Sequence, residues 1–590
     1  MPYILRLFST LGCIGLLLGV VASAFAQQAA DDFAPEIATS ITAKTLKKPV
    51  NSDDWMVSVA NPHAARAAAT IMKSGGNAID AAIAAQLVLG LVEPQSSGLG
   101  GGAFLVFFDA ETNTLTTLDG RETAPSAATS KLFQKPDGKP MGFFDAVIGG
   151  RSVGVPGTPA LLEEMSKRWG NKSWNSLFQP AIALSENGFE VSGRLAKLLE
   201  NGKDSLSQQK QAADLFIPNG QPLKEGAVLK NLDYAQTLRT LADNGAQAFY
   251  SGPLAQQIVD TITSFEPNPG LMSTQDLANY KVIERKPVCA PYRGKNVCGM
   301  GPPSSGALTV GQILGVLEPY DLAKLGPNSA DAWRLIGDAT RLAFADRGRY
   351  MADSDYVKMP TKGLLKPDYL QSRSRLLKSK TAIEKPTAGE PSWDEAALPR
   401  ADDISLELPS TTHFSIVDAD GNVVSMTSTI ENGFGSRLVT NGFLLNNELT
   451  DFSFRDERDG KPIANRIEPG KRPRSSMSPT IVMENGKPIL AIGSPGGSRI
   501  IPYVAKTLIA HFDWGMDIQQ AISSPHLANR FGSYDIEAGT AAEKLAPELE
   551  ALGYKVKIRS LNSGLHGIDL RNGKLTGGAD PRREGIVLGE

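Results

Sequence analysis

The chain has 590 residues, of which 41% are hydrophobic and 21% charged, so it can form several ordinary domains or one large layered domain. Sixty basic and 63 acidic residues leave a net charge of -3, and neither sign forms a long run. This argues against dedicated nucleic-acid binding, which needs a clustered cationic surface. Three cysteines and five histidines match no zinc or iron–sulfur spacing, so we expect no metal and no other cofactor.

The first 26 residues are predicted to be a signal peptide. Arg6 precedes an apolar stretch from Leu11 to Val21, and Ala24-Phe25-Ala26 fits an A-x-A cleavage site, so the mature chain would begin at Gln27. A membrane anchor is the alternative, but the apolar stretch is short for a bilayer span. We expect a secreted protein without a stable membrane anchor, periplasmic if the source is Gram-negative.

Helix and strand signals alternate along the mature chain. Asn77 can cap an apolar helix over residues 78–91. Two strand-like runs, 103–108 and 114–118, follow and are joined by a polar turn. Residues 145–262 are then predicted to be mostly helical. This alternation favours a layered α/β domain.

Two cysteines flank a predicted hairpin turn. A two-residue turn at Arg293-Gly294 would place Cys289 opposite Cys298, and an oxidising compartment would let them form a disulfide. Two buried thiols without a bond are an equally good interpretation. Neither arrangement makes the cysteines catalytic.

A second predicted hairpin brings polar residues together. Strand-forming residues lie on both sides of the segment 418–422. A two-residue turn at Asp420-Gly421 would pair Thr411 with Ile430, and a three-residue loop would pair it with Glu431. Either register brings Thr429 and Glu431 close to Thr411. Threonine is also a common strand residue, so this cluster alone is a weak indication of catalysis.

A glycine-rich loop, Gly493-Ser494-Pro495-Gly496-Gly497-Ser498-Arg499, lies between a predicted strand at 489–492 and a predicted helix at 500–509. Consecutive glycines at such a place can direct successive N–H groups at one oxyanion. A phosphate-binding loop is less favoured because no Gly-Lys-Ser/Thr follows, and an ordinary tight turn is the simplest alternative.

Six separate motifs resemble the γ-glutamyltransferase family, also called γ-glutamyl transpeptidases, of the N-terminal-nucleophile hydrolases. They occur in order along nearly the whole mature chain: Glu93-Pro94-Gln95-Ser96-Ser97-Gly98-Leu99-Gly100-Gly101-Gly102, Arg121-Glu122-Thr123-Ala124-Pro125, Thr411-Thr412-His413-Phe414-Ser415, Leu444-Leu445-Asn446-Asn447-Glu448, Arg474-Ser475-Ser476-Met477-Ser478-Pro479-Thr480 and the glycine-rich loop. Chance agreement in this order is not credible.

The resemblance implies an α/β (α+β) fold, a four-layer αββα sandwich, made as an inactive precursor that cuts itself between Ser410 and Thr411. Residues 27–410 would form the large subunit and 411–590 the small catalytic subunit of a heterodimer. A flexible, exposed connector, predicted over 381–410 from its prolines and charges, ends at this bond. Cleavage would free an α-amine with a reference pKa of about 7.7 to 8.0, suited to act as base for the adjacent hydroxyl.

The resemblance also implies roles for single residues. Thr411 would be the nucleophile. The family's other residues match this sequence as follows: Thr429 hydrogen-bonds the nucleophile, Gly496 and Gly497 form the oxyanion hole, Arg121, Ser475 and Ser476 hold the α-carboxylate of the γ-glutamyl group, and Glu448 and Asp451 hold its α-ammonium.

Two departures from the family concern the substrate end of the site. Glu431 stands where typical members have an asparagine that helps to bind the substrate and bonds a lid tyrosine. No tyrosine occurs between Asp451 and Arg474, so a latched lid is expected to be absent or differently built. An extra carboxylate could assist ammonium binding or weaken γ-glutamyl selectivity.

The expected function is transfer and hydrolysis of the γ-glutamyl group of glutathione and related amides, through a threonine acyl-enzyme, to water or to amino-acid or peptide acceptors. An acylase for glutaryl-type amides, similar to the family's cephalosporin acylases, is the alternative. A catalytically silent periplasmic binding protein is a third hypothesis, against which the set of Thr411, Thr429 and the glycine pair speaks.

Overall fold

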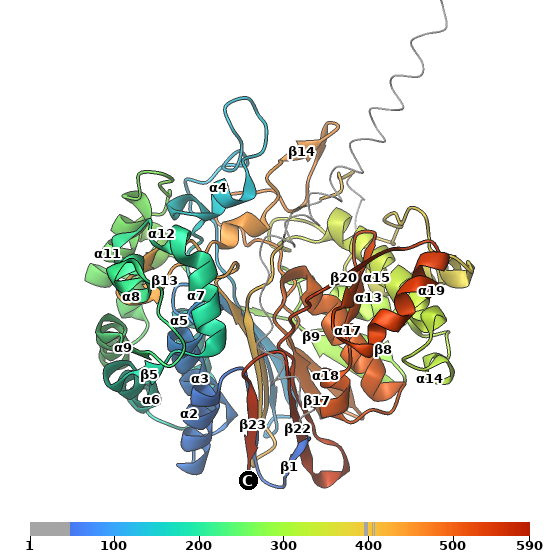
Figure 1. The fold of residues 1–590 in the computed structure, drawn as a ribbon, viewed down its shortest axis with the longest axis horizontal. Helices are drawn as coiled ribbons and strands as arrows, with labels where there is room; N and C mark the ends of the chain where they lie inside the picture. The colour runs from blue at the N-terminus through green and yellow to red at the C-terminus, as the bar shows by residue number, and fades with distance from the viewer. Residues whose placement is uncertain (1–47, 394–398, 404, 406) are drawn as a thin grey trace, which may run out of the picture.

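Two seven-stranded sheets stack at the centre of the protein in the computed structural model, and helices cover both outer faces (Figure 1). The structure describes residues 48–393, 399–403, 405 and 407–590, so the predicted signal peptide lies outside it. None of the helices in this described part combines the length and apolar composition that a bilayer crossing requires. The layering confirms the αββα sandwich expected from the sequence.

Both sheets take strands from distant parts of the chain, and all their neighbouring strands are antiparallel. The first sheet has the order β23 (Ile586–Gly589), β2 (Met56–Val59), β10 (Thr412–Val417), β11 (Val423–Thr429), β3 (Gly102–Asp109), β4 (Thr114–Gly120), β7 (Ile283–Arg285). The second has the order β1 (Val50–Ser52), β22 (Leu575–Ala579), β21 (His566–Asp569), β17 (Lys487–Gly493), β16 (Thr480–Glu484), β9 (Lys295–Gly299), β8 (Val288–Tyr292).

The helices divide between the two outer layers. On the side of the first sheet lie α2 (Pro62–Lys73), α3 (Ala78–Val92), α5 (Thr158–Trp169), α6 (Trp174–Asn187), α7 (Gly193–Leu206), α8 (Lys210–Phe216), α9 (Leu232–Asn244), α10 (Gln247–Tyr250), α11 (Gly252–Thr263) and α12 (Thr274–Ala278). On the side of the second lie α13 (Gly306–Leu317), α14 (Leu322–Leu325), α15 (Ala330–Tyr350), α16 (Pro367–Ser374), α17 (Ile500–Phe512), α18 (Ile518–Ser523) and α19 (Ala546–Ala551).

Shorter elements complete the described chain. They are α4 (Phe143–Val147) and the strand groups β5 (Phe189–Glu190) with β6 (Val228–Leu229), β12 (Val439–Thr440) with β13 (Phe443–Leu444), β14 (Glu457–Arg458) with β15 (Lys461–Pro462), and β18 (Leu527–Asn529) with β19 (Ser533–Glu537) and β20 (Lys555–Arg559).

Apolar side chains fill the space between the two sheets. Val106 and Phe108 of the first sheet pack in one buried cluster with Ile481 and Ile568 of the second. The hydroxyl of Ser425 on β11 also donates to the carbonyl of Ile492 on β17 over 3.2 Å. Close packing of this kind resists shear. It therefore holds β10 and β11 in a constant position relative to the loop that follows β17.

The helix predicted after Asn77 is confirmed as α3. Asn77 accepts from the N–H of Asp80, and the Asp80 carboxylate accepts from the N–H of Asn77, which makes a reciprocal capping box. Every residue of α3 is buried because α2 and α6 pack on its outer side and β10 and β11 on its inner side. The predicted strands at 103–108 and 114–118 are likewise confirmed as β3 and β4.

The hairpin of β10 and β11 differs from both predicted registers, which are wrong. Thr412 pairs with Ser428, so the connecting loop contains five residues, 418–422. The carboxylate of Asp418 accepts from the N–H of Asn422 over 2.8 Å, and the Asp418 N–H donates to the Asn422 carbonyl. These bonds close a longer loop than the Asp-Gly pair alone suggests. Compared with the register of the predicted two-residue turn, the strand pairing is shifted by one residue. This shift brings Thr411 level with Thr429.

The two hairpin cysteines lie opposite each other. Cys289 of β8 pairs with Cys298 of β9, and a disulfide joins them. The turn between the strands has positive φ angles at Arg293 and Gly294, of 49° and 75°. This is the backbone of the two-residue turn predicted from the sequence.

The connector predicted over 381–410 follows an irregular path in its described parts. The carbonyl of Ile383 accepts from Arg341, and the carbonyl of Gly389 accepts from the Tyr350 hydroxyl over 2.6 Å. The segment thus runs along α15 before it reaches Thr411. Its flexibility stays a prediction.

Candidate active site

Thr411 and Thr429 lie side by side at one end of the hairpin. Their Oγ1 atoms are 3.0 Å apart, and both side chains are almost completely buried. The Oγ1 of Thr429 also accepts the N–H of Glu431 over 2.9 Å. This bond leaves the Thr429 hydroxyl proton able to point at Thr411. Thr429 can therefore support negative charge as it develops on the Thr411 oxygen.

The backbone of Thr411 adopts a conformation that β-branched residues rarely have. Its φ is 88°, in the left-handed region where the Cβ substituents crowd the backbone. The Thr411 carbonyl accepts from Arg583 over 2.9 Å. The backbone torsion at Thr411 is thus strained, next to the bond at which cleavage is expected.

The glycine-rich loop reaches the carbonyl of that same peptide bond. The N–H of Gly496 donates to the Ser410 carbonyl over 3.1 Å. Gly497 has a φ of 56°, and a Cβ there would lie 2.5 Å from the carbonyl oxygen of Leu408. Only glycine fits against this backbone. The short helix η7 (Gly497–Arg499) and then α17 follow, in agreement with the predicted strand–loop–helix order.

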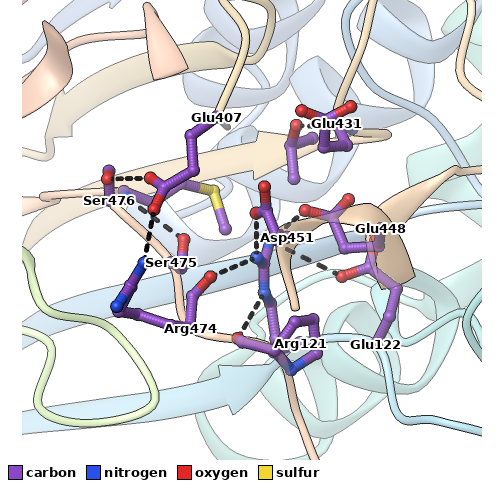
Figure 2. Close-up of polar contacts among 12 residues, drawn as sticks. Arg121, Glu122, Glu407, Glu431, Glu448, Asp451, Arg474, Ser475 and Ser476 are labelled. Carbon is purple, nitrogen blue, oxygen red and sulfur yellow. Dashed lines mark hydrogen bonds and ion pairs between the residues drawn. The ribbon is translucent and has the colours of Figure 1, made fainter. Parts of the chain in front are cut away.

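A group of acidic side chains surrounds Arg121 (Figure 2). We call Arg121 with Glu122, Glu431, Glu448 and Asp451 the acidic cluster. Arg121 follows β4, and its guanidinium forms ion pairs with Glu448 and, over 2.6 Å, with Asp451, both on the short helix η6 (Glu448–Asp451). Glu122 lies 3.9 Å from the same guanidinium. Arg121 therefore holds the two acids that the sequence assigned to ammonium binding.

Burial disfavours the ionised form of the carboxylates in the acidic cluster. It raises the pKa of Glu122 to about 7, and it raises the pKa values of Glu431, Glu448 and Asp451 well above their ordinary range. Within the described residues, both carboxylate oxygens of Glu122, Oε1 of Glu431 and Oε2 of Glu448 have no hydrogen-bond partner. A bound cation would satisfy such oxygens.

Glu431, the departure from the family, belongs to this cluster. Its φ is 72°, and its Oε2 accepts from the side-chain amide of Asn447. The charge of Asp451 adds to the burial that raises its pKa. Glu431 thus lies beside Thr429 and Asp451, where an α-ammonium would be held.

A second group of charges surrounds Glu407, four residues before Thr411, and was not predicted from the sequence. The carboxylate of Glu407 accepts from Arg347 over 2.6 and 2.8 Å and from the Ser476 hydroxyl, and it lies 3.3 Å from Arg474 (Figure 2). We call Arg347 and Arg474 the arginine pair. Burial opposes the charge on Glu407, but the two arginines lower its pKa to about 2. The sequence feature that could have indicated this group is that Arg474 directly precedes Ser475 and Ser476.

The residues predicted separately meet at one small cavity of about 20 Å³. Its lining consists of Arg121, Glu407, Leu408, Thr411, Thr429, Glu431, Glu448, Asp451, Ser475, Ser476, Met477, Gly497 and Ile500. Gly496 adjoins it through its bond to Ser410. Glu407 and Leu408, which precede the expected cleavage bond, are part of this lining.

The segment between Asp451 and Arg474 contains no tyrosine, and other side chains fix it to the rest of the protein. The ring of Phe454 stacks on Phe133 with centroids 4.6 Å apart, and Asp456 accepts from Ser130 over 3.0 Å. The hairpin of β14 and β15 extends beyond these contacts, near α4 at the top of Figure 1. That a tyrosine-latched lid is absent or differently built stays a prediction.

Comparisons with known proteins agree with this geometry. A family model described as gamma-glutamyltranspeptidase matches residues 64–590. The chain is 39% identical over 549 residues to a glutathione hydrolase proenzyme of Bacillus subtilis (strain 168), covering 91% of each chain. It is 36% identical over 548 residues to one of Escherichia coli (strain K12), covering 90% of this chain and 91% of that one. The crystal structure of a cephalosporin acylase from Bacillus halodurans matches with a TM-score of 0.81 and 26% identity, covering 92% of this chain and 97% of that chain.

Proposed function

The chain belongs to the gamma-glutamyltranspeptidase family of enzymes, and we propose that it is a self-cleaving γ-glutamyl transferase and hydrolase with Thr411 as nucleophile. One observation carries this proposal: the Thr411 hydroxyl lies 3.0 Å from that of Thr429, while the adjacent Ser410 carbonyl accepts from the Gly496 N–H. A nucleophile, a group that supports its charge and an oxyanion donor thus meet at a single peptide bond.

Self-cleavage follows from this arrangement. The Thr411 oxygen attacks the Ser410 carbonyl, the oxyanion forms at the Gly496 N–H, and the C–N bond breaks as the Thr411 nitrogen takes up a proton. Water then hydrolyses the ester, which leaves a carboxyl group on Ser410 and an α-amine on Thr411. The strained φ of 88° at Thr411 favours this step, because the constraint ends when the bond is cut.

Turnover of a donor repeats the same chemistry. The new α-amine, with a reference pKa of about 7.7 to 8.0, takes the proton of the Thr411 hydroxyl. Thr411 attacks the γ-glutamyl amide carbonyl, Gly496 and Gly497 stabilise the oxyanion, and the amine leaves. Water or the amine of an amino acid or peptide then releases the γ-glutamyl group from the enzyme. The large and small subunits remain together as a heterodimer.

The charged groups around Thr411 fit a zwitterionic donor such as glutathione. Arg121, Ser475 and Ser476 would hold the α-carboxylate, while Glu431, Glu448 and Asp451 would hold the α-ammonium. The unpartnered oxygens of Glu431 and Glu448 support ammonium binding, because an ammonium group offers three donors.

A glutaryl acylase is the second candidate function. Its support is the structural match to a cephalosporin acylase at a TM-score of 0.81. A glutaryl group is a γ-glutamyl group without the α-amine, so the acidic cluster would gain nothing from it. The four buried acids around Arg121 therefore favour the γ-glutamyl donor.

Secretion is also part of the proposal. The disulfide between Cys289 and Cys298 supports an oxidising compartment. The signal peptide over residues 1–26 remains a prediction.

The test begins with the purified mature protein. It should give two chains on a denaturing gel, the smaller starting at Thr411 by N-terminal sequencing. Thr411→Ala should remain one chain and be inactive, whereas the control Thr411→Ser, which keeps a hydroxyl, should still be cut. Normal cleavage of Thr411→Ala would refute the nucleophile. Rates on γ-glutamyl and glutaryl anilides then decide between the two functions.

A further inference from the structure

A serine, a histidine and an aspartate that have no role in the chemistry above lie in contact beside the glycine-rich loop. The Oγ of Ser563 lies 2.6 Å from the Nε2 of His526, and the Ser563 hydroxyl donates to the carboxylate of Asp580. All three side chains are almost completely buried, and we call them the buried triplet. These are the residue types of a nucleophilic triad, so the order of their hydrogen bonds decides what they can do.

The order of these bonds excludes Ser563 as a nucleophile. Burial opposes the charge on Asp580, but Arg582 and the Ser563 hydroxyl lower its pKa, so the carboxylate is ionised and can only accept. The Ser563 proton therefore points at Asp580, and the Ser563 oxygen accepts the Nε2–H of His526. In a nucleophilic triad the histidine takes the serine proton instead. The buried triplet is thus a directed series of hydrogen bonds from His526 to Asp580.

A tyrosine connects the buried triplet to the oxyanion donor Gly496. The His526 ring packs on Tyr503 with ring centroids 4.1 Å apart. The Tyr503 ring in turn lies against Gly496, because a Cβ on Gly496 would lie 2.9 Å from a ring carbon of Tyr503. Gly496 has a φ of 136°, a region that only glycine enters readily. The direction of its N–H therefore depends on the side chains packed around it.

A backbone segment next to the buried triplet also packs on the glycine-rich loop. The N–H of Gly564 donates to the Ser494 hydroxyl over 3.4 Å, and a Cβ on Gly564 would lie 2.6 Å from Pro495. The Asp580 carboxylate accepts the N–H of Leu565 over 3.0 Å. Asp580 therefore fixes the backbone that contacts the loop just before its two glycines.

We propose that His526, Ser563 and Asp580 are positioning residues that hold the Gly496 N–H where the oxyanion forms. This inference rests on the proposed function, because it concerns the oxyanion donor of that reaction. Misplacing a group in an active site by 1 Å can cost about a hundredfold in rate. Self-cleavage and donor turnover both place their oxyanion at Gly496. Loss of the buried triplet should therefore slow both reactions by a similar factor.

The kinetic test uses Ser563→Ala, which removes one hydroxyl and leaves Asp580 its bonds to backbone N–H groups. We expect kcat for a γ-glutamyl anilide to fall by about tenfold or more, KM to stay within about twofold, and self-cleavage to slow by the same factor as kcat. The matched control is Tyr369→Phe, which removes another buried hydroxyl, one that donates to Asp346 over 2.7 Å outside the cavity. This control should leave both rates unchanged.

His526→Phe tests whether the three residues act together. Phenylalanine keeps a ring against Tyr503 but cannot donate to Ser563, so kcat should fall about as much as in Ser563→Ala. The double variant should lose no more than either single variant, because residues in one hydrogen-bond network are not independent. Losses that multiply, a raised KM with kcat unchanged, or no loss at all would overturn the inference.

A second measurement does not depend on activity. In the uncut Thr411→Ala protein, adding Ser563→Ala should speed amide hydrogen exchange in the peptide covering residues 494–499 by about tenfold or more, because exchange reports local opening. Adding Tyr369→Phe should leave this exchange unchanged. Unaltered exchange with Ser563→Ala would overturn the inference. If the parent chain is never cut and turns over no donor, the proposed function fails, and the exchange rates still decide whether Ser563 holds the loop.

Discussion

The acidic cluster and the arginine pair adjoin each other, since Arg121 donates to the Arg474 carbonyl over 3.1 Å, but they differ in which part of the chain supplies the opposing charge. Arg121 and its carboxylate partners Glu448 and Asp451 come from parts of the chain other than the segment that ends at Ser410. The acids that face the arginine pair, Asp403 and Glu407, both belong to that segment. Loss of this segment would therefore remove the acids from the arginine pair and leave the ion pairs of Arg121 in place.

This difference bears on the proposed γ-glutamyl donor, whose α-amino acid group is a zwitterion. An α-amino acid group carries an ammonium and a carboxylate on one carbon, so its site needs both signs of charge a few ångströms apart. The acidic cluster exists before cleavage. The carboxylate of Glu407 opposes the charge of the arginine pair, which keeps the two buried arginines paired.

Replacing Arg121 with lysine should have the largest effect on donor binding among the changes considered. Lysine keeps the charge but cannot bond Glu448 and Asp451 at the same time as the donor, because it lacks the planar fork. We expect KM for γ-glutamyl donors to rise at least a hundredfold, about 3 kcal/mol, with much less effect on self-cleavage. Arg582→Lys, at a buried arginine paired with Glu537 outside the cavity, is the control. An unchanged KM would show that Arg121 is only structural.

The two groups should also respond to pH in opposite directions. The pKa of Glu122 is raised to about 7, so the folded protein binds more protons than the unfolded chain, and stability falls as pH rises from about 4.5 to 7. The pKa of Glu407 is lowered to about 2, so the unfolded chain binds more protons, and stability rises with pH from about 2 to 4.5.

Denaturant unfolding of the uncut Thr411→Ala protein can measure how the free energy of unfolding changes with pH in both ranges. Glu122→Gln should remove about 3 kcal/mol of pH dependence from the upper window, and Glu407→Gln a similar amount from the lower window. If each variant alters the other's window, or neither alters any, the opposite charge environments described for the two groups would be wrong.

The smallest expected effect on donor turnover is that of Glu431→Asn. Loss of its carboxylate should weaken γ-glutamyl turnover by about 1.5 kcal/mol, roughly tenfold in kcat/KM, and leave glutaryl turnover nearly unchanged. Glu431→Gln is the isosteric control and should behave like asparagine if charge is what matters. A ratio of the two donors that does not move would show that Glu431 takes no part in choosing the substrate.

Local sequence signals predicted most of the elements around the site. The helix cap at Asn77, the strands 103–108 and 114–118, and the strand before Gly493 follow from periodicity and from turn and cap residues, which act over a few positions. The register of the β10–β11 hairpin did not, because Asp418 uses its carboxylate to close a five-residue loop. A side chain that competes for backbone donors is not visible in the alternation of apolar residues.

The sequence by itself determined the family, the αββα layers and a set of candidate residues, because these depend on motifs and on local patterns. Only the tertiary structure decided which charges oppose one another. Glu407 lies 60 residues from Arg347 and 67 from Arg474 along the chain, yet its carboxylate lies between them. Ion pairs between distant segments are set by how the two sheets and their helices pack. The spacing of these residues along the chain therefore does not predict the ion pairs that they form.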